Sequence, residues 1–323
     1  MKKVIISFFF FLIFLALYAL TNPVMVLKVE QEKVSMLSVN PERLKIDVAA
    51  LTGTPKPRNY KNLSSLNQAA NYVRQEFEKQ QIAVTEQKYL VYGVEYKNII
   101  CSFGPENAER LIVGAHYDVY GENPGADDNA SGTAGLLELA RLIKSQNPDL
   151  KYRVDLVAYT LEEPPFFRTE FMGSAIHAKS LFDAGIKVKG MISLDMIGYF
   201  SDAPKSQNYP LGFLKLFYPT VGNYIAVVGN LGNIGMVRKV KKEMKKTAEL
   251  KVKSINAPAS LPGIDFSDHR NYWKYDYDAV MITNTAIYRN KNYHEPTDTP
   301  ETLNYEKMAE VVKGVYGAVV NYS

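Results

Sequence analysis

The sequence predicts an α/β protein built in three layers, with a mixed and mostly parallel sheet between two layers of helices. Short apolar runs of strand length alternate along the chain with segments whose apolar residues recur at helical spacing. Acidic or imidazole side chains follow four of these apolar runs, which is typical of parallel strands that end at one edge of a sheet. With 323 residues, of which 46% are hydrophobic and 22% charged, the chain is long enough to form a substantial core.

The predicted elements begin near Asn62 and continue to the end of the chain. The first are a helix over 66–77, strands over 82–89, 96–102 and 111–113, and a helix over 131–143. The later ones are strands over 154–160, 191–194, 224–228 and 279–283, with helices over 172–182, 238–246 and 305–320. Strands that alternate with helices in this way favour parallel pairing through helical crossovers.

The N-terminal end has the pattern of a targeting segment. Lys2 and Lys3 precede an apolar run over 4–20 that only Ser7 interrupts, which predicts a signal peptide or an N-terminal membrane anchor over 1–21. By the positive-inside rule, we expect the remainder to be exported: extracellular, periplasmic or on the outer face of the cell membrane. Residues 22–61 mix charges, prolines and scattered apolar residues, so we expect a lead-in segment there and one folded domain over 62–323.

Charge and cysteine content exclude several classes of function. The net charge of +4 is small for this length, and the one marked basic run, over 238–246, has the pattern of a solvated helix face. We therefore expect no nucleic-acid partner. Cys101 is the only cysteine, so the chain can form no internal disulfide and no cysteine-based metal or redox motif.

The polar residues that follow the predicted strands form a candidate metal site. They are His116 with Asp127, the pair Glu162 and Glu163, Asp195, and His294. Imidazoles and carboxylates without a thiolate suit zinc with an open position, or two divalent ions that share a carboxylate. Two ions about 3.5–4 Å apart can hold a hydroxide and polarise a carbonyl together, so the pattern indicates hydrolysis or acyl transfer.

Each of these residues also has an ordinary structural explanation when it is taken alone. A His-x-Asp pair such as His116 and Asp118 is common on surfaces, adjacent acidic residues often solvate a loop, and Asp195 could cap a turn. The joint order and placement of the residues carries the prediction of a site.

Six motifs occur in a fixed order along the chain. They are GAHYD at 114–118, PGADDNASG at 124–132, LEEPP at 161–165, SLDMIG at 193–198, FSDHRNYW at 266–273 and YHEPTDT at 293–299. This series resembles the co-catalytic zinc exopeptidases, the family typified by the secreted bacterial leucine aminopeptidases, in a superfamily with glutamate carboxypeptidase II and glutaminyl cyclase. The resemblance covers about residues 62–323 and implies the zinc exopeptidase fold with two bound Zn²⁺ ions.

The resemblance also implies a role for each residue of the candidate site. The implied metal ligands are a bridging Asp127, His116 and Asp195 on one ion, and Glu163 and His294 on the other. Glu162 would be the general base, which takes a proton from the metal-bridging water and delivers it to the leaving amine.

Further residues are implied around the metal ligands. Asp118 would accept the second ring N–H of His116 and so fix its tautomer. Asp268 and His269, from the Ser-Asp-His segment, would support the substrate pocket together with Tyr293, although a turn before a helix explains Asp268 and His269 equally well. The peptide bond between Asp127 and Asp128 would be cis, as is typical of the family.

The resemblance favours an aminopeptidase that removes N-terminal residues from peptide substrates. No gap between the motifs is long enough for the inserted domain of larger relatives, so we expect an open site that acts on small peptides. Two alternatives use the same fold: a carboxypeptidase, and a glutaminyl-peptide cyclotransferase, whose subfamily typically has Trp where this chain has Tyr293. A non-enzymatic receptor on this fold is disfavoured, because such members have lost metal ligands that this chain keeps.

Overall fold

One mixed sheet lies at the centre of the structure, a computed structural model that describes residues 2–21 and 37–322. The strands run in the order β1-β2-β4-β3-β5-β8-β6-β7. Their bounds are β1 (Val84–Val91), β2 (Val94–Phe103), β3 (Arg110–His116), β4 (Arg153–Tyr159), β5 (Val188–Leu194), β6 (Tyr224–Gly229), β7 (Lys251–Asn256) and β8 (Ala279–Thr283). The central pairs β4-β3, β3-β5 and β5-β8 are parallel, as is β6-β7, and the other pairs are antiparallel.

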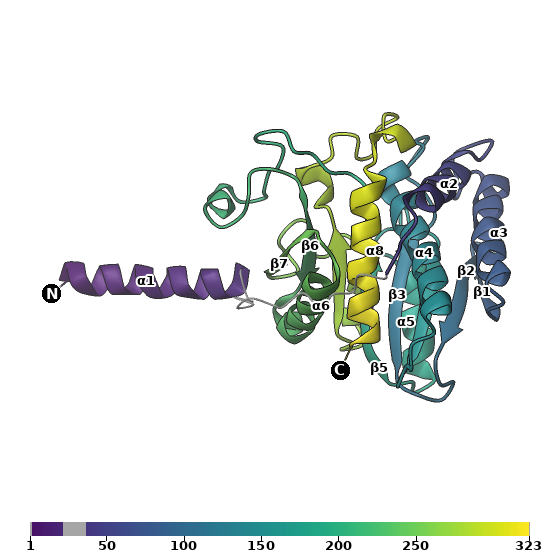
Figure 1. The fold of residues 1–323 in the computed structure, drawn as a ribbon, viewed down its shortest axis with the longest axis horizontal. Helices are drawn as coiled ribbons and strands as arrows, with labels where there is room; N and C mark the ends of the chain where they lie inside the picture. The colour runs from purple at the N-terminus through teal and green to yellow at the C-terminus, as the bar shows by residue number, and fades with distance from the viewer. Residues whose placement is uncertain (1, 22–36, 323) are drawn as a thin grey trace.

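Helices cover both faces of the sheet and complete the predicted three layers (Figure 1). One face packs against α3 (Leu63–Lys79), α4 (Gly132–Gln146), α6 (Ile234–Thr247) and α8 (Tyr305–Val320), and the other against α5 (Gly173–Asp183) and the short α7 (Arg270–Trp273). Side chains of a strand alternate between its two faces, so the apolar run of β3 serves both layers. Leu111 and Val113 belong to the larger core, whereas Ile112 packs in the core beneath α5.

The folded part of the chain begins earlier than the sequence predicted, so the expected lead-in over 22–61 is too long. α2 (Pro41–Thr52) packs against α4 and α8 and contributes Leu44, Val48 and Leu51 to the main core. Asn40 caps its first turn by accepting two main-chain hydrogen bonds. The helical spacing of these apolar residues is present in the sequence, but charged residues surround it. Residues 22–36 of the expected lead-in lie outside the described part of the chain.

A buried ion-pair network joins α2, α3 and α4. The Arg141 guanidinium donates to Asp47 at 2.5 Å, to Glu76 at 2.7 Å and to Glu138 at 3.1 Å. Removing one partner from a buried ion pair costs about 3–5 kcal/mol, because the remaining charge stays buried. The network therefore fastens the first helices of the domain to α4.

Strand β7 was not predicted, because Lys251 and Lys253 interrupt its apolar pattern. It pairs with β6 at the edge of the sheet, where the exposed Lys251 opposes pairing with other chains.

Helix α1 (Lys2–Thr21) projects outward from the three layers (Figure 1), with contacts to β7 and of Phe14 to Phe217, and its apolar side chains over 4–15 are exposed. Among the helices built from the described residues, none is both long enough and apolar enough to cross a membrane. The targeting role of this segment stays a prediction.

Candidate metal centre

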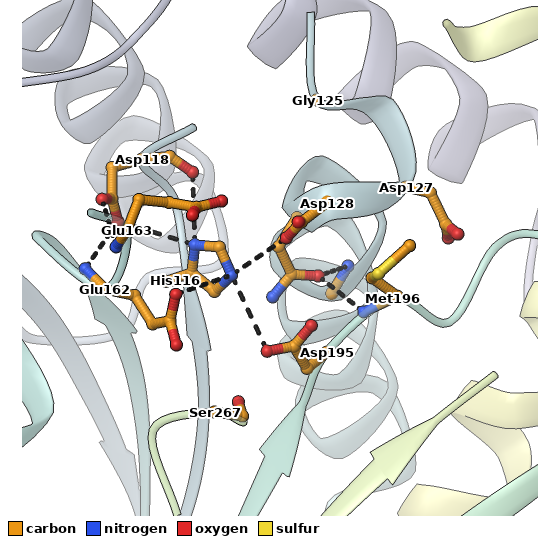
Figure 2. Close-up of polar contacts among 12 residues, drawn as sticks. His116, Asp118, Gly125, Asp127, Asp128, Glu162, Glu163, Asp195, Met196 and Ser267 are labelled. Carbon is orange, nitrogen blue, oxygen red and sulfur yellow. Dashed lines mark hydrogen bonds and ion pairs between the residues drawn. The ribbon is translucent and has the colours of Figure 1, made fainter. Parts of the chain in front are cut away.

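Most of the predicted metal-site residues come together at the carboxyl ends of the central parallel strands, and Figure 2 shows His116, Glu162, Glu163 and Asp195 among them. His116 is the last residue of β3, the pair Glu162 and Glu163 follows β4, and Asp195 follows β5 directly. His294 comes from the long loop after β8. Because these four strands are neighbours and run parallel, segments far apart in sequence meet at one edge of the sheet.

Asp128 is the carboxylate that lies between the two imidazoles. Its Oδ1 atom is 3.3 Å from His116 Nε2, and its Oδ2 atom is 3.2 Å from His294 Nε2. Glu163 Oε2 lies 3.3 Å from His294 Nε2, and Asp195 Oδ2 lies 3.8 Å from His116 Nε2. Two groups of possible metal-ligand atoms therefore share Asp128: one with His116 and Asp195, the other with Glu163 and His294.

The bridging assignment to Asp127 is therefore wrong by one residue. The Asp127 carboxylate points away from His116 (Figure 2) and accepts hydrogen bonds from the Asn284 and Asn290 side-chain amides at 2.7 and 2.8 Å. Its other oxygen accepts the main-chain N–H groups of Gly198 and Tyr199 at 2.9 and 3.1 Å.

The local backbone explains why Asp128, and not Asp127, faces the two histidines. Asp127 and Asp128 begin the irregular π-helical turn Ala126–Ser131, and Asp128 has non-helical angles, with φ −108° and ψ 90°, so neighbouring side chains diverge. Asp298 holds the turn by accepting both main-chain N–H groups, from Asp127 at 2.9 Å and from Asp128 at 3.0 Å. The cis peptide bond likewise joins Asp128 and Asn129 rather than Asp127 and Asp128.

Asp118 connects the end of β3 to the glutamate pair. Its main-chain carbonyl lies 3.2 Å from His116 Nδ1, and its carboxylate Oδ1 lies 3.5 Å from the same nitrogen. Both are acceptors, so Nδ1 carries the proton and Nε2 faces the carboxylate cluster. The Asp118 carboxylate also accepts the main-chain N–H groups of Glu162 and Glu163 at 3.2 and 3.1 Å. Asp118 thus orients both the histidine and the glutamates.

The donor set fits a divalent cation. Burial raises the pKa of Asp195 to about 8 and that of Glu163 to about 7, and the nearby charge of Asp128 adds to both shifts. Burial opposes the charge of His294, but the hydrogen bonds that its ring donates to the carboxylates of Asp128 and Glu163 raise its pKa to about 10. Glu163 Oε1 is buried and has no hydrogen-bond partner among the described residues. A bound cation would satisfy this oxygen and offset the crowded negative charge.

Two tyrosines stack against the His294 imidazole. The ring of Tyr293, a predicted pocket residue, lies 3.9 Å from it and the ring of Tyr120 lies 4.1 Å from it, measured between centroids. Tyr293 also lines the pocket that opens on the metal centre. No sequence pattern distinguished Tyr120 from other loop aromatics.

Asp268 and His269 do not reach the pocket, in contrast to their predicted place beside the substrate. Both side chains are fully buried, and His269 Nε2 donates to the carbonyl of Ile264 at 2.8 Å. Burial lowers the pKa of His269 to about 4, so this imidazole is neutral near neutral pH. This hydrogen bond fixes the position of Ile264, whose loop forms one wall of the pocket. His269 therefore supports the pocket wall without lining the pocket.

The pocket extends from the metal centre across an apolar face of the sheet. Its floor is formed by Tyr224, Ala226 and Val228 of β6 together with Met281 of β8. Its walls come from the four loops that follow β4, β5, β7 and β8, and they include Phe167, Tyr209, Leu214, Tyr218, Leu261, Ile264, Phe266, Ile287 and Tyr288. A polar, acidic end thus continues into a largely apolar cavity.

Two imidazoles and a buried set of carboxylates at the strand ends of an α/β sheet are the ligand types of a metal-dependent enzyme. Residues 98–319 match the model of peptidase family M28, so the chain belongs to that family. The family resemblance predicted from the six motifs is confirmed.

Two relatives are similar to this chain over most of their length. A protein of Escherichia coli K12, described as uncharacterized protein YfbL, is 49% identical over 290 residues, which cover 87% of this chain and 88% of YfbL. Leucine aminopeptidase 1 of Arthroderma otae is 24% identical over 300 residues, which cover 84% of this chain and 74% of that protein. Family and relatives together support a metallopeptidase.

Solved structures share the fold. LapB from Legionella pneumophila has a TM-score of 0.70 at 21% identity, covering 88% of this chain and 72% of LapB. Glutaminyl cyclase from Porphyromonas gingivalis has a TM-score of 0.66 at 20% identity, covering 88% of this chain and 99% of the cyclase. At these identities the similarity concerns the fold, which both proteins share with this chain.

Proposed function

We propose that this protein is a zinc-dependent aminopeptidase that removes N-terminal residues from peptides. The observation that carries the proposal is the position of Asp128 between His116 and His294, which creates two ligand groups that share one carboxylate. His116 and Asp195 would hold one zinc ion with Asp128, and Glu163 and His294 would hold the second. When bound, the ions supply Lewis acidity that polarises the scissile carbonyl and lowers the pKa of water.

Glu162 has the features of the general base. Its Oε2 atom lies 3.9 Å from His116 Nε2, and the residue lines the pocket at its acidic end. Burial and then the neighbouring carboxylates raise its pKa well above that of an exposed glutamate, with His116 opposing the shift. A base of raised pKa would accept the proton of the attacking water and pass it to the leaving amine. The acidic end of the pocket also suits the ammonium group of a peptide N-terminus.

The proposal is tested by mass spectrometry of products from a mixed peptide set, with elemental analysis of the bound metal. We expect two zinc ions per chain and stepwise loss of N-terminal residues, which a chelator abolishes and added zinc restores. Three other results contradict the proposal. Loss of C-terminal residues would show a carboxypeptidase, and ammonia loss from N-terminal glutamine would show a cyclotransferase. Unchanged peptides with a folded, zinc-loaded protein would show that the chain is not a peptidase for this set.

The apolar pocket predicts a preference for peptides that begin with a large apolar residue. Ala226 lines the pocket between Tyr224 and Val228 on β6, so the larger side chain in Ala226→Phe would occupy part of the cavity. We expect kcat/KM for peptides with N-terminal leucine or phenylalanine to fall about 10–200-fold, the range for changes of hydrophobic pocket shape. Peptides that begin with alanine serve as the internal control and should change less. An equal loss for all peptides would contradict the assignment of this cavity to the N-terminal side chain.

We also propose that the protein acts outside the cytoplasm, on the support of Lys2, Lys3 and the exposed apolar helix α1. The test is a C-terminal fusion of the full chain to alkaline phosphatase, which is active only after export. We expect phosphatase activity with the full chain and its loss when residues 2–21 are deleted. Equal activity of the two fusions would contradict this location.

A further inference from the structure

Arg58 is a buried arginine that contacts the metal-binding loops from behind. It lies in the segment between α2 and α3, before the residues that match the family model, and is 1% exposed. Its guanidinium donates to three carbonyls of the loop over 117–125: Tyr117 at 2.8 Å, Pro124 at 2.5 Å and Gly125 at 2.6 Å. A longer contact of 3.4 Å reaches the carbonyl of Leu51 at the end of α2.

The acceptors of Arg58 lie beside the residues of the metal centre. Tyr117 separates His116 from Asp118, and Gly125 comes three residues before Asp128. The loop therefore begins directly after His116 and ends three residues before Asp128, and the Arg58 side chain holds both of its ends. Asn59 adds a contact in the middle of the loop, because its amide donates to the carbonyl of Gly121.

The packing around Gly125 shows that this loop has little room to shift. Gly125 has a φ of +63°, and a Cβ atom there would lie 2.2 Å from Val119 Cγ2 and 2.4 Å from the carbonyl oxygen of Asp128. The same atom would lie 3.2 Å from Arg58 Nη2. The left-handed turn thus brings the loop against Arg58 on one side and against Asp128 on the other.

The charge of Arg58 is not used in a direct ion pair with any described carboxylate. All of its hydrogen bonds go to neutral main-chain carbonyls. Burial lowers its pKa to about 10, opposed by the nearby charges of Asp298 and Asp118, so the guanidinium stays protonated at neutral pH. Hydrogen bonds from a charged donor are about twice as strong as neutral ones, which suits a side chain that fixes three carbonyls.

We propose that Arg58 is a positioning residue for the metal centre, holding the loop over 117–125 so that His116 and Asp128 face each other before metal binds. The proposal rests on the metal site described under the proposed function. Positioning and charge act in opposite directions on metal affinity. A positive charge repels a cation, so removing it alone would strengthen zinc binding, whereas releasing the loop would weaken binding.

The test measures the zinc affinity of the full-length apo protein by competition with a chromophoric chelator, without substrate. Arg58→Lys keeps the charge but cannot reach three carbonyls with a planar fork, and Arg58→Met removes both features. We expect zinc binding about 10–100-fold weaker in both variants, the range for residues that orient metal ligands. Wild-type affinity in Arg58→Lys, or tighter binding in Arg58→Met, would overturn the proposal.

Arg141→Lys is the matched control, because Arg141 is also a buried arginine but bonds Asp47, Glu76 and Glu138 instead of the metal loops. We expect this variant to lower the unfolding temperature while its zinc affinity stays at the wild-type value. An equal loss of zinc affinity in Arg141→Lys would overturn the proposal, since the effect would then follow from general destabilisation.

If the Arg58 variants do not fold, Gly125→Ala tests whether the position of the loop over 117–125 determines zinc affinity while Arg58 is intact. The added Cβ must displace the loop, so zinc affinity should fall, and an unchanged affinity would overturn the proposal. Zinc binding is measured without peptides, so a wild-type protein that binds zinc but cleaves nothing would refute the proposed function and leave the role of Arg58 standing.

Discussion

Glu162→Gln is expected to keep both metal ions and to lower kcat by about 10²–10⁴-fold, the usual contribution of a general acid–base residue. Glutamine has nearly the shape of glutamate and preserves the packing of this buried side chain, but its amide cannot accept and return a proton. The hydrogen bonds that Asp118 makes with the main chain of this pair are unaffected by the change. The measurements are kcat on an N-terminal leucine peptide and the zinc content of the purified variant.

Glu163→Gln is the matched control, since it makes the same substitution at the next residue. Glu163 contacts His294 at 3.3 Å and belongs to a ligand group with Asp128, so this variant should lose metal rather than only turnover. Two results contradict the assignment of the base: full turnover in Glu162→Gln, or loss of zinc from Glu162→Gln with retention in Glu163→Gln.

The fold and the outline of the site could be predicted because both follow from local patterns. A buried parallel strand is a short apolar run, so β3, β4, β5 and β8 were visible in sequence, together with the polar residue that follows each. Parallel neighbours then place those residues at one edge without further information. His116, Glu163, Asp195 and His294 meet in the structure for this reason.

The features that sequence missed depend on contacts between distant segments. Arg58 acts on main-chain groups of a loop far along the chain, at Tyr117, Pro124 and Gly125. A main-chain acceptor carries no residue signature, so no spacing rule finds such partners. Helix α2 was not predicted for a related reason. Its few apolar residues stabilise the helix only because α4 and α8 bury them.

The sequence pattern does not distinguish Asp127 from Asp128 as the carboxylate that faces the two histidines. Both are acidic, adjacent and buried, and either could face the histidines. The direction is decided by Asn284, Asn290 and the main-chain N–H groups after β5, which bind the Asp127 carboxylate and leave Asp128 to the metal centre. One-residue errors of this kind are expected wherever two equivalent side chains follow a strand, since neighbours point in different directions.

Asp128→Asn is therefore expected to abolish paired metal binding, with zinc content falling from two ions per chain to fewer than one. The two carboxylate oxygens of Asp128 serve different partners, Oδ1 facing His116 and Oδ2 facing His294. Asparagine offers a single oxygen and no negative charge, and its NH₂ group would face one of the two ligand groups. Elemental analysis after dialysis against micromolar zinc measures the loss, and peptide cleavage should disappear with the metal.

Asp127→Asn is the control that separates the two aspartates. The Asp127 carboxylate accepts five hydrogen bonds that orient the turn, so its amide variant should bind zinc about 10–100-fold more weakly yet reach two ions per chain at saturation. If Asp127 were the shared ligand, the pattern would reverse, with Asp127→Asn unable to hold two ions and Asp128→Asn still able to do so. The pair of variants thus decides which carboxylate joins the two halves of the centre, because they differ by one position in sequence and face opposite sides of the same turn.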